Sequence, residues 1–148
     1  MATLSIGRAL GWSALFDLSL HHAYTRATFA GGPNEGKLLP YAPEHMGGAV
    51  IDVGVGGFSA QLAARFVSAQ FTDARNTVAE DATGTIGRID PYVTIDAALA
   101  YRHARSGLSL RLALKNALDD VHVVARRPEG IFADGFRQVI VGVRWEQR

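Results

Sequence analysis

Residues Leu108–Lys115 read Leu-Ser-Leu-Arg-Leu-Ala-Leu-Lys, so an apolar side chain stands at every second position. A period of two is typical of a β-strand whose two faces meet different surroundings. Further stretches alternate in the same way within residues 13–24, 49–53, 58–67, 92–102 and 138–145. In every stretch, each Asp, Glu, Lys and Arg falls on the parity opposite to the mainly apolar one. The pattern predicts an all-β, antiparallel architecture of about six strands.

The connections between these stretches alternate in length. Long polar segments span Ala30–His45, Asp73–Asp90 and Ala117–Gly135. Tight turns at Gly54–Gly57 and Arg105–Gly107 separate them. Alternating long and short connections are typical of transmembrane β-barrels, in which periplasmic turns are short and extracellular loops are long.

Strand length and aromatic residues favour a membrane protein. The stretch Phe58–Phe71 would extend about 46 Å at ~3.3 Å per residue and would rise about 33 Å when tilted by ~45°, enough to cross a hydrocarbon core ~30 Å thick. Aromatic residues gather near the ends of the stretches, where membrane girdles lie: Trp12, Tyr24, Phe29, Phe58, Phe71, Tyr92, Tyr101, Phe136 and Trp145. We therefore expect an antiparallel transmembrane β-barrel segment. A soluble β-sandwich binding module remains an alternative, because alternation alone does not show which face is wet.

Composition excludes several classes of protein. The chain has 148 residues, a formal charge of +1 and no cysteine. This length suits one domain, and the lack of cysteine excludes disulfide scaffolds, thiolate metal sites and a cysteine nucleophile. The balanced charge argues against nucleic acid as a partner. The first residues, Met1–Arg8, lack the pattern of a secretory signal, so we expect either a cytoplasmic protein or a piece of a longer chain.

One glycine-rich stretch suggests an enzyme. Residues 50–57, Val-Ile-Asp-Val-Gly-Val-Gly-Gly, are similar to the glycine loop of a nucleotide-binding or methyl-donor-binding α/β enzyme, with Asp52, Gly54 and Gly56 at the donor site. However, Ser59 occupies the position of the third glycine, and no alternation of strands and helices follows. A glycine-rich hairpin turn explains the same residues, so we favour the turn and keep the enzyme as an alternative.

The histidines do not form a recognisable ligand pattern. His21 and His22 are adjacent and point to opposite faces of a strand, and His103 and His122 have no partner at a ligand-like spacing. The sequence also lacks a Gly-x-Ser-x-Gly nucleophile elbow. We therefore predict no metal, no cofactor and no catalytic residue, and thus no enzyme.

Three segments resemble, in order and spacing, the last third of the barrel of TonB-dependent outer-membrane receptors. They are Phe71-Thr-Asp-Ala-Arg-Asn-Thr77, Ile89-Asp-Pro-Tyr-Val-Thr-Ile-Asp96 and Leu112-Ala-Leu-Lys-Asn-Ala-Leu-Asp119. The resemblance runs from about Gly11 to Trp145. It assigns a structural role to the motif residues Asp73, Asn76, Pro91, Tyr92, Asn116 and Asp119.

This resemblance implies an outer-membrane receptor for TonB-energised uptake of a ligand such as an iron–siderophore. Residues 1–148 would be the partial, C-terminal part of the β-barrel in a longer chain, without the plug domain and earlier strands. Its partners would be that plug, the remaining barrel strands, the TonB complex, outer-membrane lipid and a ferric siderophore or similar ligand. Arg126 and Arg127, in a long extracellular loop, are candidate contacts for an anionic ligand. Six strands cannot close a barrel, so we do not expect this chain to transport alone.

Overall fold

The computed structural model describes residues 2–5 and 14–146, so Gly11, Trp12 and Ser13 lie outside the described residues. The described residues contain no helix, and therefore none that is long and apolar enough to cross a membrane. In chain order their strands are β1 (Ala2–Ser5), β2 (Ala14–Tyr24), β3 (His45–Val55), β4 (Phe58–Val67), β5 (Gln70–Phe71), β6 (Arg88–Ile89), β7 (Tyr92–His103), β8 (Leu108–Lys115), β9 (His122–Arg127), β10 (Gly130–Asp134) and β11 (Gln138–Trp145).

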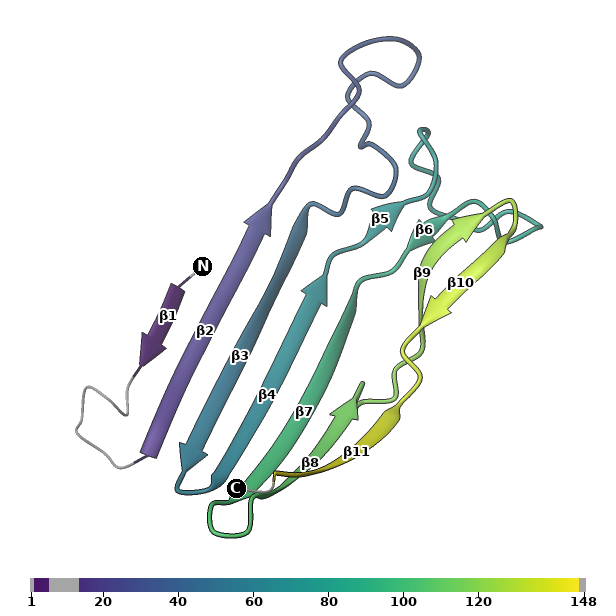
Figure 1. The fold of residues 1–148 in the computed structure, drawn as a ribbon. Helices are drawn as coiled ribbons and strands as arrows, with labels where there is room; N and C mark the ends of the chain where they lie inside the picture. Colours follow the sequence, from purple (N-terminus) through teal and green to yellow (C-terminus); the bar gives the residue numbers. More distant parts are fainter. Residues whose placement is uncertain (1, 6–13, 147–148) are drawn as a thin grey trace.

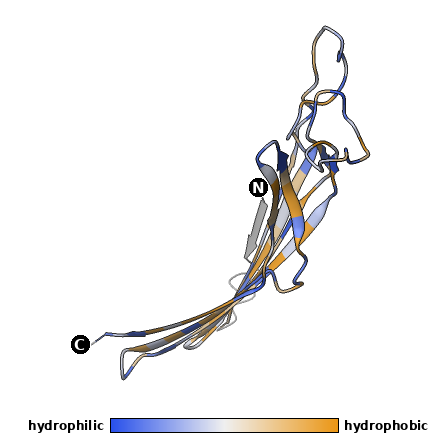
Figure 2. Cartoon of the chain, turned by 90° about the vertical axis from the view of Figure 1, so that its right-hand side faces the viewer, coloured by the Kyte–Doolittle hydropathy of each residue, from blue (hydrophilic) through white to orange (hydrophobic). Residues whose placement is uncertain are grey.

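One 7-stranded sheet dominates the molecule, with the order β1-β2-β3-β4-β7-β8-β11 (Figure 1). Every pair of neighbours in it is antiparallel. Its six long strands correspond to the six alternating stretches, so the predicted fold class is confirmed. The sheet is open, and seen from the side it is a thin, curved layer (Figure 2). We call the end of the sheet that carries the long connections the loop end, and the opposite end the turn end.

The register places all apolar parities on the same face. Leu18 of β2 lies opposite Ile51 of β3, which lies opposite Leu62 of β4. Leu99 of β7 likewise lies opposite Leu112 of β8. The apolar face consists of the even positions of β2, β4 and β8 and the odd positions of β3, β7 and β11; the other positions form the polar face. Because side chains alternate along a strand, this alignment gives one apolar and one charged surface.

The sheet has almost no apolar core. Among the described residues, only Val67, Ile89 and Ala113 are buried apolar residues. On the apolar face, Leu99 is 57% exposed and Val141 is 71% exposed. A soluble β-sandwich would bury this face against a second sheet. The sandwich alternative therefore does not match the architecture, whereas a surface that faces lipid does.

The glycine-rich stretch is a hairpin. Asp52 and Gly54 lie in β3, and Gly54 pairs with Ser59 of β4 across a turn made by Gly56 and Gly57. A strand follows this turn where a donor-binding site needs a helix N-terminus. The structure thus does not support the enzyme alternative.

Two connections differ from the prediction. The stretch Phe58–Phe71 is not one continuous strand, because β4 ends at Val67 and the chain leaves the sheet to pair as β5 with β6. The break is at Ser68, whose amide donates to the carbonyl of His45 (2.9 Å) and whose hydroxyl accepts from the amide of His45 (3.0 Å). The predicted loop Ala117–Gly135 contains the hairpin β9–β10, which has no clear alternation to reveal it.

Gly107 provides a test of the turn end. It has a φ of 68°, and an added Cβ would overlap the carbonyl oxygen of Glu146, which follows β11. Gly56 has a similar φ of 57° but nothing near its absent Cβ. We expect Gly56→Ala to lower the free energy of unfolding by about 1–2 kcal/mol, because alanine pays only for adopting the left-handed backbone conformation. Gly107→Ala should lower the thermal unfolding temperature of the intact protein further, because it also displaces β11. Equal effects of the two substitutions would contradict this account.

Candidate functional site

Three long connections gather at the loop end (Figure 1). We call residues 25–44, 72–91 and 116–137 the loop cluster. Side chains from each connection bond to the backbone of another, so polar contacts join all three connections. The two candidate arginines and all motif residues except Tyr92, which begins β7, belong to this cluster.

Asn76 joins the first two connections. Its Oδ1 accepts from the amide of Leu38 (2.8 Å), and its Nδ2 donates to the carbonyl of the same residue (2.8 Å). The side chain therefore imitates one rung of a β-ladder between segments that are 38 residues apart. Asn76 has a φ of 55°, a conformation that asparagine tolerates better than most residues. Nearby, the ammonium of Lys37 donates to the carbonyl of Arg75 (2.5 Å).

Asp73 shapes the turn that presents Asn76. Its carboxylate accepts from the amide and the hydroxyl of Thr77 (both 2.9 Å) and from the amide of Arg75 (3.2 Å). Partial burial of Asp73 raises the pKa of its carboxyl, but the hydrogen bonds from Thr77 and Arg75 outweigh this effect. The pKa is therefore held below its ordinary value of 3.8.

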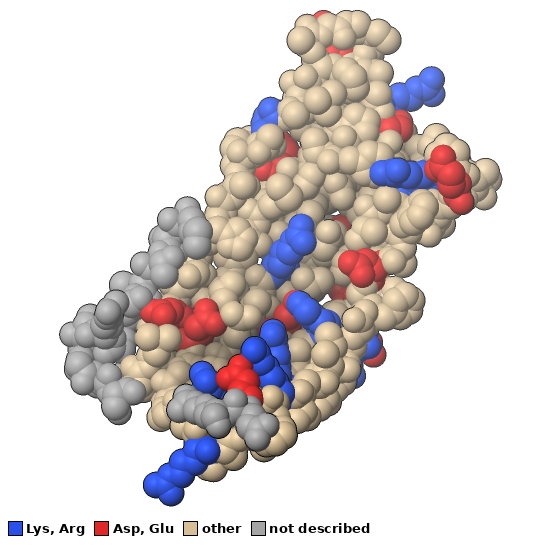
Figure 3. Space-filling view, viewed as in Figure 1, with Lys and Arg blue, Asp and Glu red and all other residues tan. Residues whose placement is uncertain are grey.

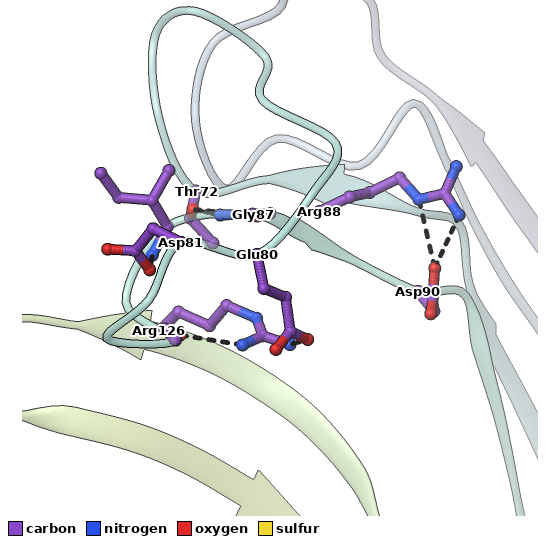
Figure 4. Close-up of polar contacts among 9 residues, drawn as sticks. Thr72, Glu80, Asp81, Gly87, Arg88, Asp90 and Arg126 are labelled. Carbon is purple, nitrogen blue, oxygen red and sulfur yellow. Dashed lines mark hydrogen bonds and ion pairs between the residues drawn. The ribbon is translucent and has the colours of Figure 1, made fainter.

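Arg126 joins the second and third connections and is only 7% exposed (Figure 4). Its Nη1 donates to the carbonyl of Gly84 (2.8 Å), and its Nη2 forms an ion pair with Glu80. The hydroxyl of Tyr41, from the first connection, donates to the carbonyl of Arg126. Arg126 thus connects all three parts of the loop cluster. Arg127 is exposed, so of the two candidate ligand contacts it is the accessible one.

The remaining motif residues lie where β7 and β8 enter the loop cluster. The amide of Asn116 donates to Asp96 (2.9 Å), and its side chain donates to the carbonyls of Asp120 (3.2 Å) and Gly135. Asp119 forms an ion pair with Arg137 (3.5 Å).

Pro91 immediately precedes β7, and Tyr92 begins that strand. The ring of Tyr92 stacks on the ring of His122, with centroids 3.9 Å apart. The sequence contained no sign of this stacked pair, nor of the roles of Tyr41 and Glu80, because each contact joins segments that are distant along the chain.

Acidic side chains lie over two neighbouring strands of the polar face (Figure 3). Asp17 and Asp52 lie directly opposite each other on β2 and β3. Gln61 donates to Asp52 (2.8 Å), whereas Oδ1 of Asp17 is buried and has no partner among the described residues. Like charges at directly opposed positions repel each other.

Arginines collect on the other side of the polar face. Arg102 of β7 and Arg144 of β11 lie near the turn end and share the carboxylate of Glu146, at 3.5 Å and 2.7 Å. Arg111 of β8 makes no ion pair within residues 14–146. Asp96 of β7 pairs with Lys115 of β8 (2.5 Å) on the same face. The polar face is therefore acidic over β2 and β3 and mainly basic over β4, β7, β8 and β11. A partner with cationic groups opposite the acidic region and anionic groups opposite the basic region would compensate these charges.

Comparisons with known proteins agree on one family. A family model described as TonB dependent receptor-like, beta-barrel matches residues 2–117. The ferric citrate transporter FecA in its unliganded form superposes on 93% of this chain with a TM-score of 0.80 and 28% identity. The ferric yersiniabactin uptake receptor FyuA from Yersinia pestis covers 88% with a TM-score of 0.71 and 16% identity. The closed form of the ferric-catecholate import receptor Fiu from E. coli K12 covers 86% with a TM-score of 0.66 and 20% identity.

The likenesses to FyuA and Fiu show the fold alone, because their identities are low. This chain spans 22%, 21% and 19% of the FecA, FyuA and Fiu chains, respectively, or about a fifth of each.

Replacing Asn76 tests the bridge between the first two connections. Asn76→Ala removes both hydrogen bonds to Leu38 and leaves that backbone unpaired, at a cost of about 1–3 kcal/mol. We expect faster proteolytic cleavage around residues 37–39 while the sheet stays folded. Asn34→Ala is the matched control, since no hydrogen bond of the Asn34 side chain is present in residues 14–146. Equal cleavage in the two variants would contradict the bridge.

The lowered pKa of Asp73 predicts a dependence on pH. Because folding depresses this pKa, the carboxylate stabilises the loop fully above its unfolded value near 3.8 and loses that effect as pH falls through the folded value. Cleavage of residues 72–77 by an acid protease should therefore accelerate on acidification below pH 3.8. In Asp73→Asn, cleavage should be faster already at pH 5 and should change less with pH. An identical pH profile in both proteins would rule out this role.

Proposed function

Because this chain belongs to the family of TonB-dependent receptors, whose β-barrel model matches residues 2–117, we propose that it forms part of an outer-membrane receptor that imports an iron chelate such as a ferric siderophore. The family consists of receptors and transporters of the outer membrane, so we infer no catalytic step for this chain. The observation that carries the proposal is the exposed apolar face, aligned across six long strands and backed by a charged face.

We place the apolar face against lipid and the polar face toward the lumen. Strands of 10–12 residues, such as β4 and β7, match the length that a tilted transmembrane strand needs. The loop end would be extracellular and the turn end periplasmic, as the lengths of the connections favour. The rings of Phe58 and Tyr101, 4.3 Å apart near the turn end, would belong to the periplasmic aromatic girdle.

We further propose that residues 1–148 form a C-terminal part of a larger barrel. The sheet is open, and unpaired backbone groups at an edge cost several kcal/mol each in lipid. Outer-membrane transporters of this kind close with 22 strands around a plug. The chain also spans only 22% of the ferric citrate transporter. The remaining strands and the plug domain are therefore partners of this segment.

The separated charges of the polar face support contact with a plug. A plug with cationic groups near Asp17 and Asp52, and anionic groups near Arg102, Arg111 and Arg144, would relieve the repulsion on each side. The TonB complex would act on that plug to release the ligand. In this scheme the described strands form the wall of the lumen, and the TonB complex supplies the energy for transport.

The loop cluster supports an extracellular entrance. Arg127 is exposed and can contact an anionic chelate, whereas Arg126 holds the three connections together from inside. The iron travels inside the chelate as cargo, and the chain needs no resident metal for this step.

Uptake measurements test the proposal. Cells that produce the complete receptor as their only importer should accumulate radiolabelled iron from a ferric chelate, with ferric citrate and a ferric catecholate as first probes. Accumulation should fall to the background level when TonB is deleted. Iron accumulation that persists without TonB, or recovery of the protein in the soluble fraction, would refute the proposal.

A charge reversal tests the lumen wall in the same cells. Arg111→Glu should decrease uptake several-fold, because it places a like charge against the anionic side of the plug, while the amount of receptor in the membrane stays constant. Arg105→Glu makes the same change in the turn after β7, away from the polar face, and should leave uptake intact.

A further inference from the structure

Two histidines meet on the apolar face at the loop end. His22 lies two residues before the end of β2, and His45 is the first residue of β3. Nε2 of His22 and Nδ1 of His45 are 3.2 Å apart, and the two rings are stacked with centroids 5.4 Å apart. Both side chains are exposed and lie at the loop end, at the outer border of the surface that we place against lipid.

The strands, rather than loops, set the position of this pair. His22 lies opposite Gly47 and Tyr24 lies opposite His45, so no side chain from Gly47 separates the two imidazoles. The ring of Tyr24 lies 4.9 Å from the ring of His45 and flanks it. Just beyond, the amide of Thr25 donates to the carbonyl of Glu44 (2.9 Å) and closes the ladder.

The distance between the nitrogens suits a shared transition-metal ion. Imidazole nitrogens bind zinc at about 2.0–2.1 Å, and two nitrogens 3.2 Å apart then subtend an angle of about 100–106° at the ion. This angle lies between the square-planar and tetrahedral values that copper and zinc adopt. In the metal-free protein these two nitrogens share a hydrogen bond. An ion would replace the shared proton, and the stacked rings would rotate out of their near-parallel arrangement (25°) to turn both lone pairs toward it.

We propose that His22 and His45 form a binding site for a divalent transition-metal ion, with copper(II) preferred over zinc. Copper(II) binds imidazole most strongly among the first-row divalent ions. No cluster of three or more His, Cys, Asp and Glu side chains that could hold a metal occurs in the part of the chain that the structure describes. Water would therefore complete the coordination, and the ion would exchange readily.

This site is separate from the polar face and from the loop contacts made by Arg126 and Asn76. A bound ion would link β2 to β3 at the point where the two strands diverge into the first long connection. The ion would cross-link the two strands at the loop end of the barrel and would take no part in the path of the imported ligand.

Copper titration tests the site in the intact receptor, purified in detergent and freed of metal by a chelator. Electron paramagnetic resonance of the protein with one equivalent of CuCl₂ should show coupling to two nitrogens. His22→Gln and His45→Gln should each weaken copper binding more than about tenfold, since even the loss of an outer-shell partner costs 10- to 100-fold in affinity. His21→Gln is the matched control, because the neighbouring side chain points to the polar face.

Circular dichroism of every variant shows whether the sheet has formed, so a folding defect is separated from the loss of a ligand. Loss of the two-nitrogen signal in both single variants, with retention in the His21→Gln control, would support the site. An unchanged copper signal in His22→Gln or His45→Gln, or binding only at about millimolar copper, would overturn it.

Discussion

The alignment of alternating side chains across neighbouring strands is the constraint on which the rest of the structure depends. Leu18, Ile51 and Leu62 share a face because β2, β3 and β4 pair in one register, and Asp17, Asp52 and Gln61 share the other face for the same reason. A slip of one residue would carry every charge of a strand to the apolar side. If the apolar face meets lipid, as we propose, that error would cost about 2–4 kcal/mol for each displaced Arg or Lys near the middle of the membrane and less for Asp, so the proposed environment would favour the observed register.

The loop cluster follows a different principle. It buries little apolar surface, and Ile89 is the one large side chain there that is fully enclosed among the described residues. Its order comes from side chains that bond to the backbone of distant segments: Asn76 with Leu38, and Arg126 with Gly84. Such hydrogen bonds are directional, and a partly buried donor or acceptor that lacks its partner destabilises the fold. Connections that bury little apolar surface can be held in one shape in this way.

The two faces divide the work that we propose for the receptor. Contact with lipid needs only an unbroken apolar surface, so Leu, Val, Ala and Phe can replace one another on the apolar face within broad limits. The polar face would carry the specific information, because an acidic and a mainly basic region favour a partner with the opposite arrangement. The loop cluster lies at the end of this face, where a ligand would meet it first. Structure and proposed transport are thus linked by the direction in which alternate side chains point.

Periodicity predicted the six long strands, although only part of β3, and the faces on which Asp17 and Arg111 lie; the lengths of the connections predicted the tight turns at Gly56 and Gly107. These features depend on residues that are close along the chain, and an alternating run has the same meaning wherever it occurs. The resemblance to a receptor barrel assigned a structural role to Asn76 and Asn116, but it did not predict which residues they contact.

The tertiary structure alone decided which distant residues meet. The break of β4 at Ser68, the hairpin β9–β10, the burial of Arg126 and the approach of His22 to His45 each depend on a partner elsewhere in the chain. The sequence determined the faces of the sheet, because the side-chain period is local. It did not determine the contacts between connections, because those depend on how long segments return to each other in space.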